Sequence, residues 1–367
     1  MKKKIVHVTF DMRIGGTEQV IYNLIEHTDP KKYDVSILCL NQPIGPFGIQ
    51  LQKKSCHIIA FDRKPGFDLK LIKNIRKFII KDQIDILHCH QYTPYVYGLF
   101  ASLFTKTKII FTEHGRFYPD QRKLKRILIN PVLSLFTSAI TAISKATKNA
   151  LIKYENFPGK RIQVIYNGIN GSRFEFPTSG NLRKTLGIDE KTFVLGTVAR
   201  LDPIKNHDMM IKAFKIVHDR FSQTVLIIVG DGSERPRLVS LIAQMGMNSS
   251  VIITGFREDT PQFYNMMDLF LLTSFSEGTA MTLLEAMAST KPCIATDVGG
   301  NPEIVLKNTT GFIIPSNDEH TLADVVIKLM QDNKLSTKMG IAGRKRFEQM
   351  FTAVKMTAEY QKLYDEL

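Results

Sequence analysis

The stretch LFLLTSFSEGTAMTLLEAMASTKPCIAT, residues 269–296, indicates the fold class of this chain. Its first apolar run, Leu269–Leu272, is typical of a buried strand, and a polar loop containing glycine follows. The apolar segment Thr282–Ala288 predicts a short helix, and Cys293–Thr296 predicts the next strand. Strand, loop, helix and strand in this order are typical of a βαβ unit with parallel strands.

The same alternation of short apolar runs and amphipathic segments fills both halves of the chain. In the first half, the predicted strands are Ile5–Phe10, Val35–Leu40, Ile58–Phe61, Ile86–Cys89, Ile109–Thr112, Ala139–Ala142 and Ile162–Ile165. In the second half, they are Phe193–Val198, Val225–Val229, Val251–Thr254, Leu269–Leu272, Cys293–Thr296 and Phe312–Ile314. The pattern predicts an α/β protein with two doubly wound parallel-sheet domains. Ligands of such domains bind at the carboxyl ends of the strands.

The predicted helices lie between these strands. They are Glu18–Glu26, Leu69–Ile80, Lys145–Tyr154, His207–His218, Glu234–Met245, Thr282–Ala288 and Thr321–Gln331, with two more near 335–349 and 352–367.

A polar break separates the two predicted domains. Asn170–Gly187 lacks a long apolar run and contains Pro177, Ser179, Gly180 and Asn181, so it is the predicted linker. We therefore expect a first domain over residues 1–172, a second over 188–350, and a C-terminal helical segment over 351–367.

Composition places the chain among ordinary globular proteins. Of its 367 residues, 44% are hydrophobic and 23% charged. No apolar run reaches the roughly 18 residues of a spanning helix, and the run after the first three lysines is too short for a signal peptide. Four scattered cysteines, without a C-x-x-C pair, suit a reducing compartment. We expect a cytoplasmic protein.

The formal net charge is +14, and its excess lies entirely in residues 1–180. Such a half can attract nucleic acid, anionic lipid or an anionic substrate, or can simply be a solvated basic face. Tryptophan is absent and aromatic residues do not interleave with the basic clusters, so we expect no nucleic-acid partner.

Two basic segments leave membrane binding open. Lys70–Lys81 reads KLIKNIRKFIIK and places Leu71, Ile75 and Ile79, together with Phe78, on one helical stripe. Arg122–Arg126, RKLKR, adds further charge. The first segment is either a core-facing helix with a solvated face or a surface that docks on an anionic membrane, where the chain would be peripheral at the inner face.

Two carboxylates flank the predicted helix of the opening stretch. Glu277 lies in its loop, and Glu285 follows eight residues later, inside the apolar run LLEAMA. The free N–H groups at a helix start suit a phosphate or pyrophosphate. We therefore predict that the phosphates of a ligand that donates a sugar bind at Gly278, Thr279, Ala280, Met281 and Thr282. Glu277 would face a transferred sugar and Glu285 a ribose.

The run SEGTAMTLLEAMASTKPCIATDVGGNPEIV, Ser276–Val305, resembles the signature of the large retaining glycosyltransferase family with the GT-B fold, family 4 or group 1. The matching positions are Glu277, Glu285, Pro292, Gly299, Gly300 and Glu303. The resemblance implies two Rossmann-like domains facing a central cleft, with the last helix crossing back to the first domain. The first domain would take the acceptor and the second the nucleotide-sugar donor.

The resemblance also implies roles for residues elsewhere in the second half. Arg200 and Lys205, in GTVARLDPIK at 196–205, would bind the donor diphosphate. Two cations there would stabilise the charge that develops on the leaving group. Gly232 matches a glycine turn after a strand, and Phe256 with Arg257 lies where the family holds the base.

In the first half, the resemblance implies both donor and acceptor contacts. Gly15 and Gly16, in the first strand–helix turn, match the donor-phosphate and acceptor side, and His114 matches the histidine near the donor sugar. His88, His90 and Asn167 match the acceptor side. A lone Gly-Gly is not the dinucleotide G-x-G-x-x-G motif, so a dehydrogenase is disfavoured.

We expect no metal and no cofactor. His88, His90 and His114 could suggest a metal site, but the sequence contains no Asp-x-Asp triplet and no carboxylate cluster to complete one. One departure from the family is Gly278-Thr279-Ala280, where Gly-Phe-Gly is common, so the donor sugar cannot be carried over.

The predicted activity is retaining, metal-independent transfer of a sugar, of the hexosyltransferase type, for cell-surface polysaccharide or glycolipid synthesis. The expected partners are a nucleotide-sugar donor, with UDP first and GDP second, and a glycan or lipid-linked acceptor. The alternatives are an epimerase or phosphorylase on the same fold, and a nucleotide-sugar-binding partner subunit without activity.

Overall fold

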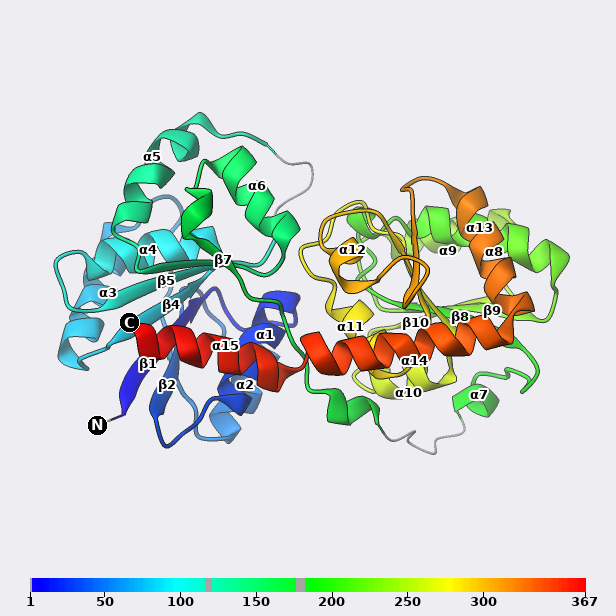
Figure 1. The fold of residues 1–367 in the computed structure, drawn as a ribbon, viewed down its shortest axis with the longest axis horizontal. Helices are drawn as coiled ribbons and strands as arrows, with labels where there is room; N and C mark the ends of the chain where they lie inside the picture. The colour runs from blue at the N-terminus through cyan, green and yellow to red at the C-terminus, as the bar shows by residue number, and fades with distance from the viewer. Residues whose placement is uncertain (1, 116–120, 176–181) are drawn as a thin grey trace. The chain divides into compact units, whose positions relative to one another are not determined.

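The computed structural model describes residues 2–115, 121–175 and 182–367 (Figure 1). Contacts divide the chain into two units. Unit 1 comprises Met1–Gly168 and Ala353–Leu367, and unit 2 comprises Ile169–Thr352. Pro177, Ser179, Gly180 and Asn181 of the predicted linker lie outside the described residues.

Unit 1 is built on a seven-stranded sheet of order β3-β2-β1-β4-β5-β6-β7. Every neighbouring pair is parallel. The strands are β1 Lys3–Thr9, β2 Tyr33–Cys39, β3 His57–Ala60, β4 Ile86–His90, β5 Lys108–Glu113, β6 Ala139–Ala142 and β7 Ile162–Val164. The parallel order follows from the helices that connect successive strands.

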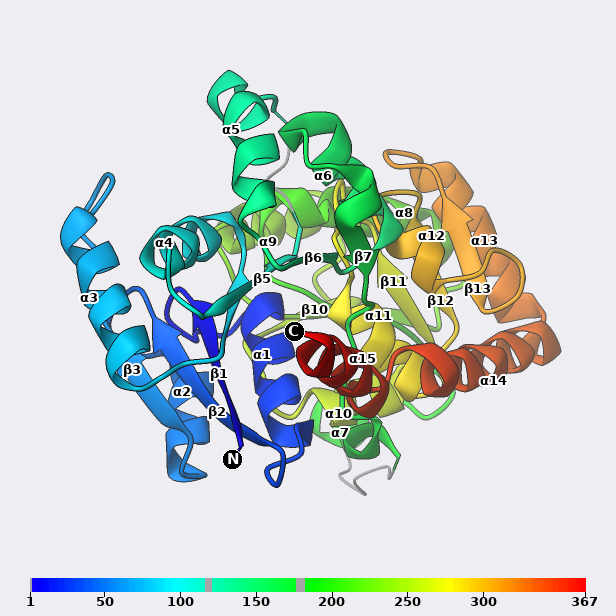
Figure 2. The ribbon, with the colours of Figure 1, turned by 60° about the vertical axis from the view of Figure 1, so that its left-hand side comes forward.

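The helices of unit 1 cover both faces of this sheet. They are α1 Gly16–His27, α2 Pro46–Lys53, α3 Leu69–Lys81, α4 Tyr92–Ser102, α5 Leu124–Leu135, α6 Lys145–Glu155 and α15 Ala353–Glu366, with the 3-10 turn η1 Gly159–Arg161. Residues of α3 and α4 share one hydrophobic cluster with β1 and β4, whereas α1 and α2 enclose another. Figure 2 shows α15 lying beside α1.

Unit 2 repeats the plan with a six-stranded sheet of order β10-β9-β8-β11-β12-β13. Its strands are β8 Phe193–Val198, β9 Thr224–Val229, β10 Val251–Gly255, β11 Leu269–Leu272, β12 Cys293–Thr296 and β13 Gly311–Ile314. Its helices and 3-10 turns are η2 Gly171–Phe174, α7 Leu182–Thr185, η3 Pro203–Lys205, α8 His207–Arg220, α9 Arg235–Gln244, α10 Thr260–Met266, α11 Met281–Ala288, α12 Asn301–Ile304, α13 Glu319–Gln331 and α14 Asn333–Met350.

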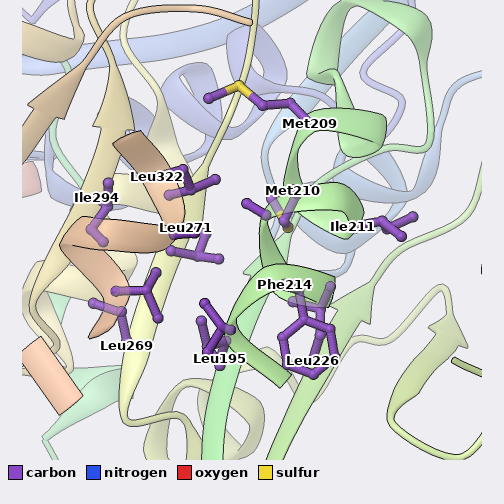
Figure 3. Close-up of a cluster of buried hydrophobic side chains, with 14 of the residues drawn as sticks. Leu195, Met209, Met210, Ile211, Phe214, Leu226, Leu269, Leu271, Ile294 and Leu322 are labelled. Carbon is purple, nitrogen blue, oxygen red and sulfur yellow. The ribbon is translucent and has the colours of Figure 1, made fainter. Parts of the chain in front are cut away.

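The core of unit 2 joins helix α8 to the middle of the sheet (Figure 3). Met210 and Phe214 of α8 meet Leu195 of β8, and all three side chains are buried. Leu269 and Leu271 of β11 extend the same cluster. The strand that ends in the Glu277 loop is therefore fixed by the centre of the core.

All thirteen predicted strands are confirmed, as are the predicted helices. Helices α2, α4, α5, α7, α10 and α12 were not predicted. Helix α4 is apolar on most sides, so it shows no 3.6-residue alternation, and α5 contains Pro131. Within the described residues, no helix combines the length and apolar character needed to cross a bilayer.

Candidate functional site

Two residues predicted from separate motifs meet in unit 2. Glu277 lies in the loop after β11, and Lys205 ends the short turn η3 after β8. The Lys205 Nζ lies 2.6 Å from Glu277 Oε1, and the Ser274 hydroxyl donates to the same oxygen at 2.6 Å. The side chains are only 20% and 9% exposed, so the ion pair is largely shielded from water. A shielded pair of this kind holds both groups in one geometry.

Backbone contacts fix the two loops against each other. The Phe275 N–H donates to the Ile204 carbonyl at 2.8 Å, and the Thr273 hydroxyl donates to the Lys205 carbonyl at 3.0 Å. On the other side, Gly300 N–H donates to the Glu277 carbonyl at 3.3 Å. Gly299, with φ +51°, passes so close that an added Cβ would lie 1.7 Å from that carbonyl oxygen.

The loop then enters helix α11 without a side-chain cap. Ala280 is the N-cap residue, and it makes no side-chain capping hydrogen bond. Gly278 and Thr279 precede it, and Met281 and Thr282 form the first turn. An uncapped helix start offers backbone N–H donors and a partial positive charge, which is the chemistry that an anion needs.

Glu285 sits on α11, one side of which packs into unit 2. Its Oε2 accepts a 2.7 Å hydrogen bond from the hydroxyl of Tyr264 on α10. Burial raises the pKa of Glu285 above its ordinary value, while the Tyr264 hydrogen bond and the charge of Arg173 oppose that rise. The carboxylate is thus oriented by a partner that the sequence motif did not reveal.

The other predicted donor residues of unit 2 lie at strand ends. Arg200 follows β8, is 74% exposed, and pairs with Asp202 at 2.8 Å. Gly232 abuts the backbone of Leu201, where a Cβ would come 2.5 Å from the carbonyl oxygen. After β10, Phe256 is exposed and Arg257 forms an ion pair with Asp259 at 2.7 Å.

In unit 1, three histidines form a hydrogen-bonded chain. His7 Nδ1 lies 2.9 Å from His90 Nε2, and His90 Nδ1 lies 2.8 Å from His114 Nε2. The rings come from β1, from the end of β4 and from the residue after β5. Burial lowers the pKa of His7 and of His114 to about 3, and it lowers the pKa of His90 far below its ordinary value. All three rings are therefore neutral near pH 7.

His88 has a different set of partners and joins the sheet to α15. Its Nδ1 lies 2.8 Å from the Tyr364 hydroxyl, and its Nε2 lies 2.7 Å from the Thr112 hydroxyl. The ring is fully buried. His88 therefore makes its hydrogen bonds inside unit 1, with Tyr364 and Thr112, whereas His90 is hydrogen-bonded to His114.

The remaining predicted residues of unit 1 lie around α1. Gly15 is the N-cap of α1 and Gly16 its first residue; an added Cβ on Gly15 would lie 2.4 Å from the Glu18 carboxylate. Asn167 is buried, and the carbonyl of the next residue, Gly168, accepts a hydrogen bond from Asn23 of α1 at 3.0 Å.

One histidine group has the spacing of a metal site. The ligand atoms of His7, His88 and His90 lie within 4.8 Å of one another. However, every ring nitrogen of the three except Nε2 of His7 already has a hydrogen-bond partner in unit 1. A metal ion at this position would have to displace these hydrogen bonds.

The structure thus joins Lys205 to Glu277 and His90 to His114, and it leaves Arg200 and Glu285 with partners of their own. Tyr264, Ser274 and His7 contribute contacts that sequence reasoning missed. No local motif marks Tyr264 or Ser274, whereas His7, a polar residue in the apolar run Ile5–Phe10, could have been noticed.

Comparison with known proteins gives one consistent result. Residues 14–173 match the model of Glycosyltransferase Family 4, and residues 179–346 match that of Glycosyl transferases group 1. EpsD of Bacillus subtilis, assigned as a glycosyltransferase, is 30% identical, with 83% of this chain and 84% of EpsD covered. N-acetyl-alpha-D-glucosaminyl L-malate synthase of Bacillus anthracis is 29% identical, with 82% and 79% covered.

Solved structures agree on the fold. HepE of Anabaena, crystallised in complex with UDP, superposes with a TM-score of 0.88 at 23% identity. The superposition covers 99% of this chain and 100% of HepE. Sucrose-phosphate synthase of Thermosynechococcus elongatus gives 0.82 at 18% identity, with 100% and 99% covered. The fold is GT-B, and the chain belongs to the group 1, family 4 glycosyltransferases.

Proposed function

We propose that this enzyme transfers a sugar from a nucleotide sugar, first of all a UDP-sugar, to a glycan or lipid-linked acceptor in cell-surface polysaccharide or glycolipid synthesis. Two relatives support this choice. One, from Escherichia coli, is named for transfer from UDP-Gal to GlcNAc-diphosphoundecaprenol and is 25% identical over the whole of this chain. Another, CapM of Staphylococcus aureus, is named for capsular polysaccharide biosynthesis.

The Lys205–Glu277 ion pair beside the start of α11 is the observation that carries the proposal. Breaking the sugar–phosphate bond builds negative charge on the departing diphosphate. Lys205, Arg200 and the N–H groups at the start of α11 would stabilise that charge without a metal ion. Glu285 would hold the ribose, and Phe256 with Arg257 the base.

We further propose that the configuration at the transferred carbon is retained. Glu277 already accepts two hydrogen bonds on Oε1, one of them from a cation, so it is a weak nucleophile and a good acceptor for a sugar hydroxyl. The departing phosphate oxygen would instead take the proton of the attacking hydroxyl on the same face of the sugar. In unit 1, His114 would bind the sugar, and Gly15 and Gly16 a phosphate.

The test is nucleotide release from a panel of nucleotide sugars in the presence of EDTA. We expect one donor to be turned over, in a manner dependent on added acceptor. Lys205→Ala should reduce that turnover by roughly a hundredfold or more, the range seen when one transition-state donor is lost. Lys212→Ala, an exposed lysine on α8, is the matched control and should leave turnover unchanged.

Other outcomes identify the alternatives. Loss of activity in EDTA that is restored by a divalent cation would refute the metal-independent mechanism. Conversion of the donor without any acceptor would indicate an epimerase, and full turnover in Lys205→Ala would remove Lys205 from the mechanism. Product of inverted configuration would exclude same-face transfer.

We also propose that the enzyme works in the cytoplasm and meets a lipid-linked acceptor at the inner face of an anionic membrane. The support is the basic excess of residues 1–180.

A further inference from the structure

Helix α5 exposes an apolar stripe to solvent. Leu124, Leu128 and Leu135 are 77%, 75% and 73% exposed. Ile129, Val132 and the adjoining Phe136 are about half exposed on the same helix. The spacing of 124, 128, 132 and 135 aligns these side chains along one face. Soluble surfaces rarely gather large apolar side chains in this way unless they bind something apolar.

The opposite face holds α5 firmly to unit 1. Arg126 forms an ion pair with Glu155 of α6 at 2.8 Å, and Asn130 Nδ2 donates to the Glu155 carbonyl at the same distance. Leu133 and Ser134 are buried. Since the helix is anchored on one side, its apolar stripe is a fixed feature of the surface.

Charge surrounds the start of this stripe. Arg122, Lys123 and Lys125 are exposed, and residues 121–136 contain no aspartate or glutamate. Helix α3, the other basic segment, differs, because Leu71, Ile75 and Ile79 of its apolar stripe are buried in the core. Helix α3 exposes Leu69 and Ile80 near its two ends beside exposed lysines, but the middle of its apolar stripe is buried. The stripe of α5, in contrast, is exposed along its length.

We propose that α5 is the surface through which this enzyme docks on an anionic lipid bilayer. Leucines set in the headgroup region supply apolar contact, and the cations at the start of the helix attract lipid phosphates. Helix α5 connects β5 to β6, which are parallel, so its first residues lie toward the carboxyl edge of the unit 1 sheet. Docking would thus bring the membrane to the edge where the predicted acceptor-side residues lie. This role rests on the proposed lipid-linked acceptor.

Vesicle co-sedimentation with the full chain tests the proposal. The chain should bind vesicles of phosphatidylglycerol and phosphatidylcholine and bind pure phosphatidylcholine weakly. Leu124→Ser, Leu128→Ser and Leu135→Ser together should abolish binding. Arg122→Gln, Lys123→Gln and Lys125→Gln together should weaken it roughly a hundredfold, at about fivefold for each charge. The control exchanges Ile341 and Val354, exposed on α14 and α15, for serine.

Activity separates this proposal from the proposed function. All variants should keep native donor turnover with a water-soluble acceptor, because α5 contains none of the predicted donor or acceptor residues. No binding of the native chain to anionic vesicles, or full binding by the leucine variant, overturns the docking role. A native dimer that the leucine variant dissociates, without vesicle binding, would instead show that a second copy covers the stripe.

The histidine chain of unit 1 supports a second, independent inference. Three neutral imidazoles carry three ring protons, and two of these lie in the links His7–His90 and His90–His114. The third must therefore lie at one end, on His7 Nε2 or on His114 Nδ1. Both end atoms are buried and lack a partner among the described residues. An unpaired buried N–H is rarer than an unpaired acceptor.

We infer that His114 presents Nδ1–H as a hydrogen-bond donor to an oxygen of its ligand, and that His90, which donates to His114 Nε2, is the positioning residue that sets this tautomer. In this state His7 donates to His90, His90 donates to His114, and His7 Nε2 keeps only an unpaired lone pair. The ligand atom that His114 recognises is then an acceptor, such as a sugar hydroxyl or phosphate oxygen.

Nitrogen NMR of ¹⁵N-histidine protein near pH 7.5, without donor or acceptor, tests the tautomer regardless of the proposed function. The resonances of His114 are assigned by their loss in His114→Gln. We expect a protonated Nδ1 and a bare Nε2; the opposite tautomer overturns the inference. His7→Phe should keep this state, because the unpaired lone pair then moves to His90, whereas His90→Phe should give a mixture. A single unchanged tautomer in His90→Phe would contradict the positioning role. If a variant does not fold, the spectrum of the native protein still tests the tautomer of His114.

Discussion

At the scale of single residues, Gly299 shapes the loop that carries Glu277. Its φ is +51°, and an added Cβ would lie 1.7 Å from the Glu277 carbonyl oxygen. Gly299→Ala must therefore displace the loop, and we expect the free energy of unfolding to fall by roughly 2–4 kcal/mol. Donor turnover should fall further than the folded fraction does, because Glu277 leaves Lys205. Urea unfolding and nucleotide release measure the two effects.

Gly246 provides the matched control for this substitution. Its φ is +68°, and nothing lies within 4 Å of its added Cβ. Gly246→Ala should therefore reduce the free energy of unfolding only through backbone strain, by about 1 kcal/mol, and should keep native turnover. Equal losses of stability in the two variants would show that the close approach of Gly299 to Glu277 has no energetic weight.

The same loop shows what could be predicted residue by residue. Lys205 and Glu277 were each identified from a local motif that resembles the glycosyltransferase family. Their ion pair could not be predicted, since it depends on how the η3 turn and the β11 loop meet through the hydrogen bonds of Thr273 and Phe275. The Tyr264–Glu285 bond was missed for the same reason: it joins two helices without any local sequence signal.

At the scale of elements, α15 is attached to the unit 1 sheet by buried polar contacts. The Tyr364 hydroxyl bonds His88, and Lys3 Nζ donates to the Tyr364 carbonyl at 2.6 Å. Tyr364→Phe leaves His88 Nδ1 without a partner, so we expect a loss of roughly 1–3 kcal/mol in the free energy of unfolding. Thermal unfolding of this variant should be compared with Val354→Ala, an exposed position on the same helix. Matching midpoints would mean that the hydroxyl contributes nothing.

Elements were predictable where burial imposes a period. The strands are short, apolar and rich in β-branched residues because both faces of a parallel sheet are covered, and each run was recognised. Helix α4 is buried on most sides and lacks the alternation that reveals an amphipathic helix. Helix α5 reverses the usual pattern, since its large apolar residues face solvent, and the exposure that suggests membrane docking is visible only in the structure.

At the scale of the whole molecule, the two units differ in how many buried histidines with a lowered pKa they contain among the described residues. Unit 1 contains four histidines, His7, His88, His90 and His114, whose pKa values burial lowers. In unit 2, burial lowers the pKa of His207 to about 4. The sequence predicted two similar α/β domains from one repeated pattern, but it could not show which histidines would be enclosed. Enclosure depends on tertiary packing, as where α15 places Tyr360 and Tyr364 against His88.

This difference predicts that acid destabilises unit 1 first. An unfolded histidine binds a proton near pH 6.5, whereas the buried rings stay neutral far below it, so the unfolded state binds more protons and stability falls as pH drops below 6.5. Each ring can contribute about 1.4 kcal/mol per pH unit. Hydrogen exchange at pH 7 and pH 5, corrected for intrinsic rates, should show protection lost in β4 and β5 before β9 and β11. Earlier loss of protection in β9 and β11 would contradict the prediction, because the groups that make the protein sensitive to acid would then lie outside the four buried histidines of unit 1.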